Sequence, residues 1–185
     1  MLKYLSCYLL ILAGLLALSG SGCYSDPHTG TLYKIAEGDH YSTPRRVGTL
    51  KDSPLTFTAV FDSTAIYDSD GDLNKLYGFS DCNSLHHNNS ARIGWRYYGD
   101  RLELWAYTYA NGVRSMEYLT SAITGLPVLC SITKGDGFYS VCAGGVCKNV
   151  PRGNTCETGV YYLLYPYFGG DLPAPHDVYI QIKEI

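Results

Sequence analysis

Short runs of β-branched and aromatic residues recur along the chain from position 55 onwards, and clusters of Gly, Pro, Asn and Asp separate them. Runs of this kind are typical of β-strands, and alternation within a run indicates which face is buried. In the last run Val178, Ile180 and Ile182 alternate with Tyr and Gln, so this strand is expected to be half-buried. The predicted strands are residues 31–35, 55–62, 90–98, 101–110, 113–121, 127–133, 138–143, 146–150, 160–167 and 178–184.

No stretch has the 3.6-residue period of a long helix, and only residues 72–79 (DLNKLYGF) could form a single helical turn. Many short strands between regular turn signals predict an all-β fold. We expect an antiparallel β-sandwich of jelly-roll type, with a closed β-barrel as the alternative. A chain of 185 residues is long enough for one such domain with a sizeable core.

The first 22 residues do not share this strand pattern. Residues 1–22 contain an early lysine, then an apolar run, then small residues, which is the pattern of a signal peptide. Cys23 follows directly, as the lipidated cysteine does in bacterial lipoproteins, although Gly20 stands where that signal usually has Leu. We therefore expect an exported protein, either an outer-membrane or periplasmic lipoprotein anchored through Cys23 or a secreted protein. Residues 23–50 are then a polar tether with a leading strand, and residues 51–185 form the sandwich domain.

Export makes disulfides possible, so the cysteines of the predicted domain are candidates for pairing. They are Cys82, Cys130, Cys142, Cys147 and Cys156. The segment 138–150 (FYSVCAGGVCKNV) predicts a hairpin with two glycines at its tip, which sets Cys142 opposite Cys147. Cα atoms in such a pair approach to about 4.5 Å, which suits a disulfide. Cys82 with Cys156 is a second predicted pair, which leaves one cysteine unpaired. The alternative is that all five are small buried hydrophobic residues.

Residues 101–121 (RLELWAYTYANGVRSMEYLTS) predict a second hairpin, because Asn-Gly is the strongest short signal for a two-residue turn. The register pairs Tyr109 with Arg114, Tyr107 with Met116 and Trp105 with Tyr118 on one face, and Leu104 with Leu119 on the other. The candidate ligand-binding site is the face with the aromatic side chains. We call it the aromatic platform, and it consists of Trp105, Tyr107, Tyr109, Arg114 and Tyr118. Aromatic faces beside a guanidinium bind sugar rings and hydroxyls well. The alternative is that this aromatic face is itself the core.

Residues 81–90 (DCNSLHHNNS) hold the densest group of candidate catalytic side chains. His86 or His87 could take a proton from a uronic acid while Arg92 neutralises its carboxylate, as in a β-eliminating lyase. The two histidines could share a zinc ion only from a loop, with residues 176–177 (His-Asp) as further ligands. The alternative is a structural loop, in which Asp, Asn and Ser side chains bond to the backbone.

A second polar cluster offers hard oxygen ligands, as calcium loops do. Its members are spaced two apart: Asp68, Asp70, Asp72 and Asn74. Gly71 is in the fourth position of this segment, where an EF-hand needs glycine at the sixth, so the segment is not an EF-hand. A structural calcium ion is the metal hypothesis here, a solvated turn is the alternative, and no other cofactor is expected.

Three segments carry a resemblance to a known group of proteins. They are residues 74–98 (NKLYGFSDCNSLHHNNSARIGWRYY), 102–114 (LELWAYTYANGVR) and 162–185 (YLLYPYFGGDLPAPHDVYIQIKEI). Over about residues 55–185 the chain resembles small exported, mostly uncharacterised proteins of Bacteroidetes-type bacteria. The sandwich layout also resembles, more loosely, concanavalin-like jelly-roll domains of lectins, glucanases and polysaccharide lyases. No active-site motif of those enzymes can be matched to this sequence residue by residue.

Charge and composition narrow the function. The formal charge of −3 gives no basic footprint for nucleic acid, whereas 18 tyrosines favour surfaces that contact partly apolar ligands. We therefore expect a non-catalytic module of the cell envelope that binds a glycan or another surface component, with membrane contact only through a lipid anchor. The alternatives are a polysaccharide lyase or glycoside hydrolase, and an adhesin or structural envelope protein.

Overall fold

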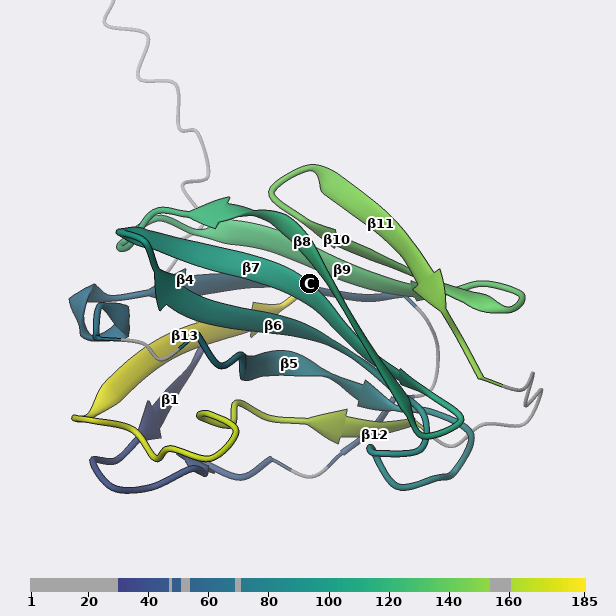
Figure 1. Cartoon of the computed structure of the whole chain (residues 1–185), viewed down its shortest axis with the longest axis horizontal. Helices are drawn as coiled ribbons and strands as arrows, with labels where there is room; N and C mark the ends of the chain where they lie inside the picture. The colour runs from purple at the N-terminus through teal and green to yellow at the C-terminus, as the bar shows by residue number, and fades with distance from the viewer. Residues whose placement is uncertain (1–29, 47, 51–53, 69–70, 154–160) are drawn as a thin grey trace, which may run out of the picture.

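The computed structural model describes residues 30–46, 48–50, 54–68, 71–153 and 161–185, and these are nearly all strands and turns (Figure 1). The strands are β1 (Thr31–Ile35), β2 (Ser42–Thr43), β3 (Thr49–Leu50), β4 (Leu55–Phe61), β5 (Asn74–Ser80), β6 (Ser90–Tyr98), β7 (Arg101–Ala110), β8 (Val113–Ala122), β9 (Val128–Lys134), β10 (Phe138–Ala143), β11 (Val146–Pro151), β12 (Tyr161–Leu164) and β13 (Val178–Glu184). A single 3₁₀ turn, η1 (Ser63–Ala65), is the only helical element among the described residues.

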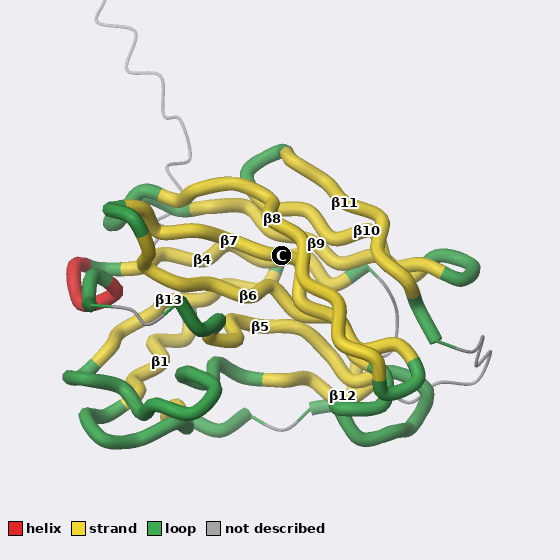
Figure 2. Tube along the Cα trace, viewed as in Figure 1, coloured by secondary structure: helices red, strands yellow, loops and turns green. Residues whose placement is uncertain are grey.

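The strands form two antiparallel sheets. The seven-stranded sheet has the order β11-β10-β9-β4-β13-β1-β2, and the six-stranded sheet has the order β3-β12-β5-β6-β7-β8. Figure 2 shows β5, β6 and β7 lying over β4, β9 and β13. Over the described residues the two sheets share no strand, so the predicted β-sandwich is confirmed and the closed barrel is wrong.

The core lies between the sheets and follows the alternation in each strand. In β4 the buried residues include Phe57 and Phe61, and in β13 they are Val178, Ile180 and Ile182, as predicted. From the facing sheet, Trp95 of β6 packs its ring 5.2 Å from that of Phe61. Because each strand sends alternate side chains to opposite faces, the residues between these positions lie on the outer faces.

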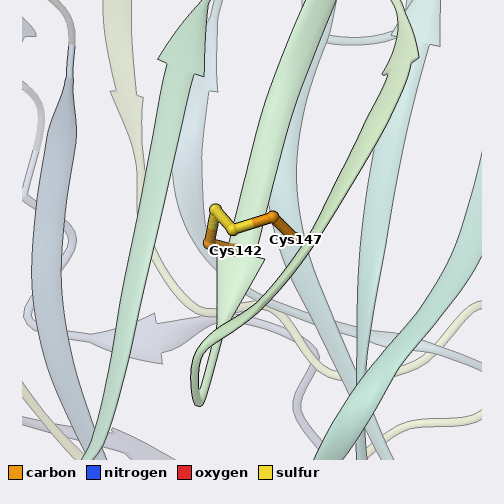
Figure 3. The surroundings of a disulfide bond; sticks show 2 residues. All are labelled: Cys142 and Cys147. Carbon is orange, nitrogen blue, oxygen red and sulfur yellow. A yellow bond between two sulfur atoms is a disulfide. The ribbon is translucent and has the colours of Figure 1, made fainter.

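Both predicted hairpins are present. Cys142 opposes Cys147 at the β10–β11 tip, the two are disulfide-bonded, and their Cα atoms are 4.1 Å apart (Figure 3). In the other hairpin Trp105 faces Tyr118, as predicted, but Leu104 pairs with Thr120. The predicted pairing of Leu104 with Leu119 is therefore wrong, because a β-bulge shifts the register by one residue between Leu104 and Trp105.

Two element predictions are wrong, the first for a tertiary reason and the second for a local one. The segment proposed as a helical turn forms β5, because Asn74–Ser80 pairs with β6 on one side and β12 on the other. The strand predicted over residues 160–167 ends at Leu164, and Pro166, which has no N–H to donate to a ladder, follows soon after. Tyr167 makes only isolated bridges, to Tyr41 and Lys75.

Several predictions involve residues outside the described part of the chain. The predicted signal peptide, the lipidation candidate Cys23, and Asp70 all lie there. Cys82 is disulfide-bonded, but Cys156, the partner predicted for it, is also outside the described residues. Cys130 is buried and has a free thiol. Among the described residues, no helix is long and apolar enough to span a membrane.

Candidate functional site

The candidate site lies on the outer face of the six-stranded sheet. Leu102, Leu104, Ala106 and Leu119 are buried in the core, so the alternative in which the aromatic face is the core is wrong. On the opposite face of β7 lie Trp105, Tyr107 and Tyr109, and the β6–β7 register puts Arg92 beside Tyr107. The predicted aromatic platform is therefore on the face away from the core, although Tyr107 is only 3% exposed because other segments cover it.

With these covering segments, part of the platform lines a pocket. We call this pocket, of about 560 Å³, the groove. Its lining residues are Tyr41, Lys75, His86, His87, Arg92, Tyr107, Tyr109, Arg114, Leu164, Tyr165, Tyr167, Gly169, Gly170 and Asp171. The predicted catalytic candidates His86, His87 and Arg92 thus lie in the same pocket as three platform members. Tyr118 does not line the groove, and its ring instead packs edge-on against that of Trp105.

A β-bulge brings Lys75 into the groove. The β5–β6 register shifts between Lys75 and Tyr77, so Tyr77 faces the core while Lys75 faces the groove. The Lys75 ammonium donates a hydrogen bond to the Gly169 carbonyl at 2.7 Å and lies over the Tyr107 and Tyr167 rings, 5.2 and 5.6 Å from their centroids. Burial, and after it the charge of Arg92, lowers the pKa of Lys75 to about 8.

Arg92 is more deeply buried than Lys75. Its side chain is 5% exposed, its guanidinium lies 5.2 Å from the Tyr107 ring centroid, and its Nε has no hydrogen-bond partner among the described residues. Burial lowers the pKa of Arg92 to about 10. Gly78 opposes Arg92 in β5, and a Cβ there would lie 2.6 Å from the Arg92 Cα, so only glycine lets the strands meet at this point.

Arg114 completes a group of three cations around Tyr107. It projects from the edge strand β8, and contact with the Tyr107 hydroxyl raises the pKa of its guanidinium. We call Lys75, Arg92 and Arg114 the cation cluster. Among the described residues none of the three forms a salt bridge; the salt bridges there are Lys34–Asp177, Arg96–Glu103 and Arg152–Asp81. The groove therefore has an excess of positive charge, with Asp171 as the single carboxylate in its lining.

Residues 81–90, which we call the histidine loop, line the groove through His86 and His87 and are held by buried and part-buried polar contacts. The Asp81 carboxylate accepts hydrogen bonds from Arg152 Nε at 2.6 Å and from the Tyr139 hydroxyl at 2.8 Å. Ser90 Oγ donates to the His86 carbonyl at 2.7 Å, and Asn89 Oδ1 accepts from the Asn111 backbone N–H at 3.0 Å. The predicted bonding of this loop's side chains to the backbone is thus confirmed for Ser90 and Asn89, and Asp81 Oδ1 likewise accepts the Cys82 N–H at 2.7 Å.

The two histidine rings point into the same pocket. His86 and His87 have ring centroids 4.2 Å apart, and His87 lies 5.4 Å from the Tyr109 ring. Burial, followed by the charge of Arg92, lowers the pKa of His86 to about 4, so this imidazole is neutral at pH 7. A neutral imidazole can donate one hydrogen bond and accept another, or accept a proton.

The predicted zinc arrangement is wrong. His176 hydrogen-bonds through Nε2 to the Thr64 carbonyl at 2.8 Å, and Asp177 forms a salt bridge with Lys34 at 2.6 Å. Neither residue lines the groove with His86 and His87. No group of three His, Cys, Asp or Glu side chains positioned to hold a metal ion is found among the described residues.

The calcium candidates are used in part for other contacts. Asn74 is buried, its amide donates to the Tyr67 hydroxyl at 2.6 Å, and its side-chain oxygen accepts the Gly169 N–H. Asp72 Oδ2 accepts the Asp171 N–H at 3.4 Å, and Asp68 is exposed. These contacts anchor the segment 169–171, which forms one wall of the groove. Calcium binding by the cluster stays a prediction.

A second, smaller pocket of about 130 Å³ continues from the groove. The two share Lys75, Tyr107, Arg114 and Gly170, and the smaller one adds Gly71, Asp72, Leu73, Arg96, Trp105 and Met116. Arg96 differs from Arg92 because it is paired: its Nε lies 2.8 Å from Glu103 Oε2 and its Nη1 donates to the Gly71 carbonyl at 2.6 Å. Glu103 also accepts the Trp105 indole N–H at 3.1 Å.

Sequence reasoning missed four other residues that line the groove, Tyr41, Lys75, Tyr165 and Tyr167. Tyr41, Tyr165 and Tyr167 come from segments read as a tether and as a strand, and Lys75 from a segment read as a helical turn. The dense aromatic run YLLYPYFGG was the available signal, since so many tyrosines exceed what one half-buried strand needs. Its partners could not be found without the long-range bridges from Tyr167 to Tyr41 and Lys75.

No protein-family model and no curated protein matches the sequence. Among solved structures, an alginate lyase of Pseudomonas aeruginosa shares 13% identity at a TM-score of 0.49, covering 71% of this chain and 64% of that one. A carbohydrate-binding module of Bacillus subtilis shares 10% identity at a TM-score of 0.37, covering 83% of this chain and 88% of that one. A β-1,3-glucanase of Mycobacterium marinum shares 11% identity at a TM-score of 0.43, covering 82% and 73%. The chain thus spans less than two thirds of the length of the alginate lyase. At these identities and TM-scores the likenesses carry no argument about ligand or activity.

Proposed function

We propose that this chain binds an acidic polysaccharide, with the carboxylate of a uronic acid held by the cation cluster and the sugar ring against the groove tyrosines. The observation that carries the proposal is the cation cluster itself: Lys75, Arg92 and Arg114 surround Tyr107 and lack a salt bridge within the described residues. A sugar acid supplies the missing anion and the ring that tyrosines contact.

The energetics favour an anionic ligand over a purely structural role. Keeping a charged guanidinium out of water without a carboxylate costs free energy, and that cost is offset when an anion enters. Arg92 offers a planar fork of donors that matches a carboxylate, and such charge-assisted hydrogen bonds are about twice as strong as neutral ones. The groove is open and holds several tyrosines, which suits a ligand with both charge and hydroxyl groups.

Binding is tested with uronate oligosaccharides on a glycan array and by isothermal titration calorimetry. We expect Arg92→Met to weaken the binding of the uronate oligosaccharides about tenfold to a hundredfold, since a hydrogen bond to a charged group contributes about 1.5–3 kcal/mol. Arg101→Met is the matched control: Arg101 begins the strand that carries Tyr107 and is exposed, but it does not line the groove. Equal binding by Arg92→Met and the wild type would refute the proposal.

A lyase is the second candidate function, and the position of His86 is the observation that favours it. A neutral His86 beside the Arg92 side of the groove can accept the proton from C5 of a uronate while Arg92 stabilises the carboxylate. The C4–O bond then breaks, a C4–C5 double bond forms, and the departing oxygen takes a proton from a groove tyrosine. No water is consumed and no redox partner is needed.

The two functions separate in one assay. A lyase releases an unsaturated uronate, whose double bond absorbs ultraviolet light, whereas a binding module leaves the polysaccharide intact. If the wild type produces the absorbance and the His86→Ala, His87→Ala double variant does not, the chain is a lyase. Equal absorbance with the wild type and the double variant would show that the two histidines take no part in the reaction. Binding without any absorbance leaves the non-catalytic module.

A further inference from the structure

The groove does not end at Tyr107 but runs on along β7. Tyr109, Tyr107 and Trp105 lie on the same face of this strand, and from the first to the last the strand rises by about 14 Å. The groove contains Tyr109 and Tyr107, and the smaller pocket contains Tyr107 and Trp105. Because Lys75 and Arg114 border both, the two pockets form one continuous depression that is long enough for more than one sugar.

The two halves of this depression differ in charge. On the groove side Arg92 is buried and has no salt bridge among the described residues. On the Trp105 side Arg96 is neutralised by Glu103, and Asp72 adds a negative charge that acts on both Lys75 and Arg114. A carboxylate is therefore attracted more strongly to the side of Arg92 than to the side of Asp72.

The Trp105 side suits a sugar without a charged group. Trp105 and Met116 provide apolar surface there, while backbone at Gly71 and Gly170 and the carboxylate of Asp72 can meet hydroxyl groups. Trp105 is held in place because its indole N–H is bonded to Glu103 and its ring contacts two side chains. The guanidinium carbon of Arg96 lies 4.8 Å from the ring centroid, and the Tyr118 ring centroid lies 5.5 Å from it. A fixed aromatic residue loses little conformational entropy on binding.

Building on the proposed function, we propose that the depression recognises a heteropolysaccharide, with a uronate beside Arg92 and Tyr107 and a neutral sugar beside Trp105. The sequence of sugars along the polymer is then read by the difference in positive charge between the two halves. A polymer made only of uronates meets Asp72 with its second carboxylate and binds more weakly.

The test uses three forms each of glucuronate, galacturonate and mannuronate: the monosaccharide, a disaccharide with a neutral sugar, and the diuronate. For at least one uronate, calorimetry should show that the mixed disaccharide binds about tenfold more tightly than the monosaccharide. The mixed disaccharide should also bind more tightly than the diuronate. Trp105→Ala should bring the ratio of mixed-disaccharide to monosaccharide affinity close to one. Asp72→Asn should raise the affinity for the diuronate about threefold to tenfold. Leu129→Ala, an exposed position on the other sheet, is the control and should leave every ratio as in the wild type.

The outcomes separate the two proposals. If no uronate binds in any form, the proposed function fails and this inference fails with it. If uronates bind but a neutral neighbour adds no affinity, or the diuronate binds as tightly as the mixed disaccharide, the heteropolymer inference is overturned and the acidic-glycan proposal stands. A Trp105→Ala variant that keeps the full disaccharide gain also overturns the inference.

Discussion

Replacing Arg92 by Met should make the protein more stable while it weakens ligand binding. The pKa of Arg92 falls from 12.5 to about 10 because burial disfavours its charged form. The pKa of Arg92 is therefore lower in the folded state than in the unfolded state. At neutral pH the guanidinium is charged in both states, so the folded state bears the full free-energy cost of burying that charge. A drop of this size corresponds to about 3 kcal/mol, and it is relieved only as the pH rises through about 10.

Met removes that penalty and keeps most of the side-chain volume. It also loses the contact of the guanidinium with the Tyr107 ring, which is worth about 0.5–2 kcal/mol. The net expectation is an increase of about 1–3 kcal/mol in the free energy of unfolding, in line with the replacement of other buried charges by apolar residues. Urea titrations followed by tyrosine and tryptophan fluorescence measure it as a higher midpoint with an unchanged slope.

Two arginines on the same sheet serve as controls. Arg96→Met should be destabilising, because Arg96 is paired with Glu103 and its loss leaves a carboxylate that is 8% exposed without its partner. Arg101→Met should change the free energy of unfolding by no more than about 0.5 kcal/mol, since Arg101 is exposed. If Arg92→Met lowers the free energy of unfolding by more than 1 kcal/mol, Arg92 has a structural role, and our interpretation of it as a ligand-binding residue is wrong.

Three further predictions concern the walls and the frame of the groove. The affinity for uronate oligosaccharides should fall by up to about tenfold per pH unit above about pH 8, because Lys75 loses its charge there. In calorimetric titrations Lys75→Arg should abolish this decline. A wild-type affinity that does not change with pH would contradict the prediction. Asp81→Asn should cost about 3–5 kcal/mol by removing the buried charge that pairs with Arg152, and hydrogen exchange at residues 82–89 should become faster. Protected amides there would show that the loop is held otherwise. Replacing Cys142 and Cys147 together by Ser should lower the free energy of unfolding by about 2 kcal/mol, as expected for a disulfide that closes so short a loop. The affinity for uronates should stay unchanged, because the disulfide lies on the other sheet. An altered affinity would indicate coupling between the sheets.

Short sequence motifs predicted the two hairpins correctly, because residues close together in the chain decide the register of a hairpin. The Asn111-Gly112 turn set the pairing of Tyr107 with Met116 and Tyr109 with Arg114, and the glycine pair set Cys142 opposite Cys147. Alternation then placed the leucines and the aromatic residues of β7 on opposite faces, and only the structure showed that the leucine face is the core. The pairings and the division into two faces depend on neighbours within about ten residues along the chain, so the sequence is enough to find them.

The groove could not be predicted in the same way because its walls come from distant segments. Lys75 reaches it through a β-bulge, which reverses the alternation that a sequence pattern assumes. Tyr167 reaches it through bridges to Tyr41 and Lys75, across more than ninety residues of sequence in each case. The candidate histidines 86 and 87 lie in the groove beside the platform, whereas His176 lies outside the groove. No local pattern in the sequence distinguishes these two outcomes.

The central claim is that the cation cluster binds a sugar carboxylate, and the most direct test changes the ligand and not the protein. Calorimetry would compare a uronate oligosaccharide with the same oligosaccharide after its carboxylates have been reduced to primary alcohols. We predict that reduction weakens binding at least tenfold, since it removes the charge that Lys75, Arg92 and Arg114 contact and keeps the sugar rings. Equal affinity for the acidic and the reduced oligosaccharide would contradict the account.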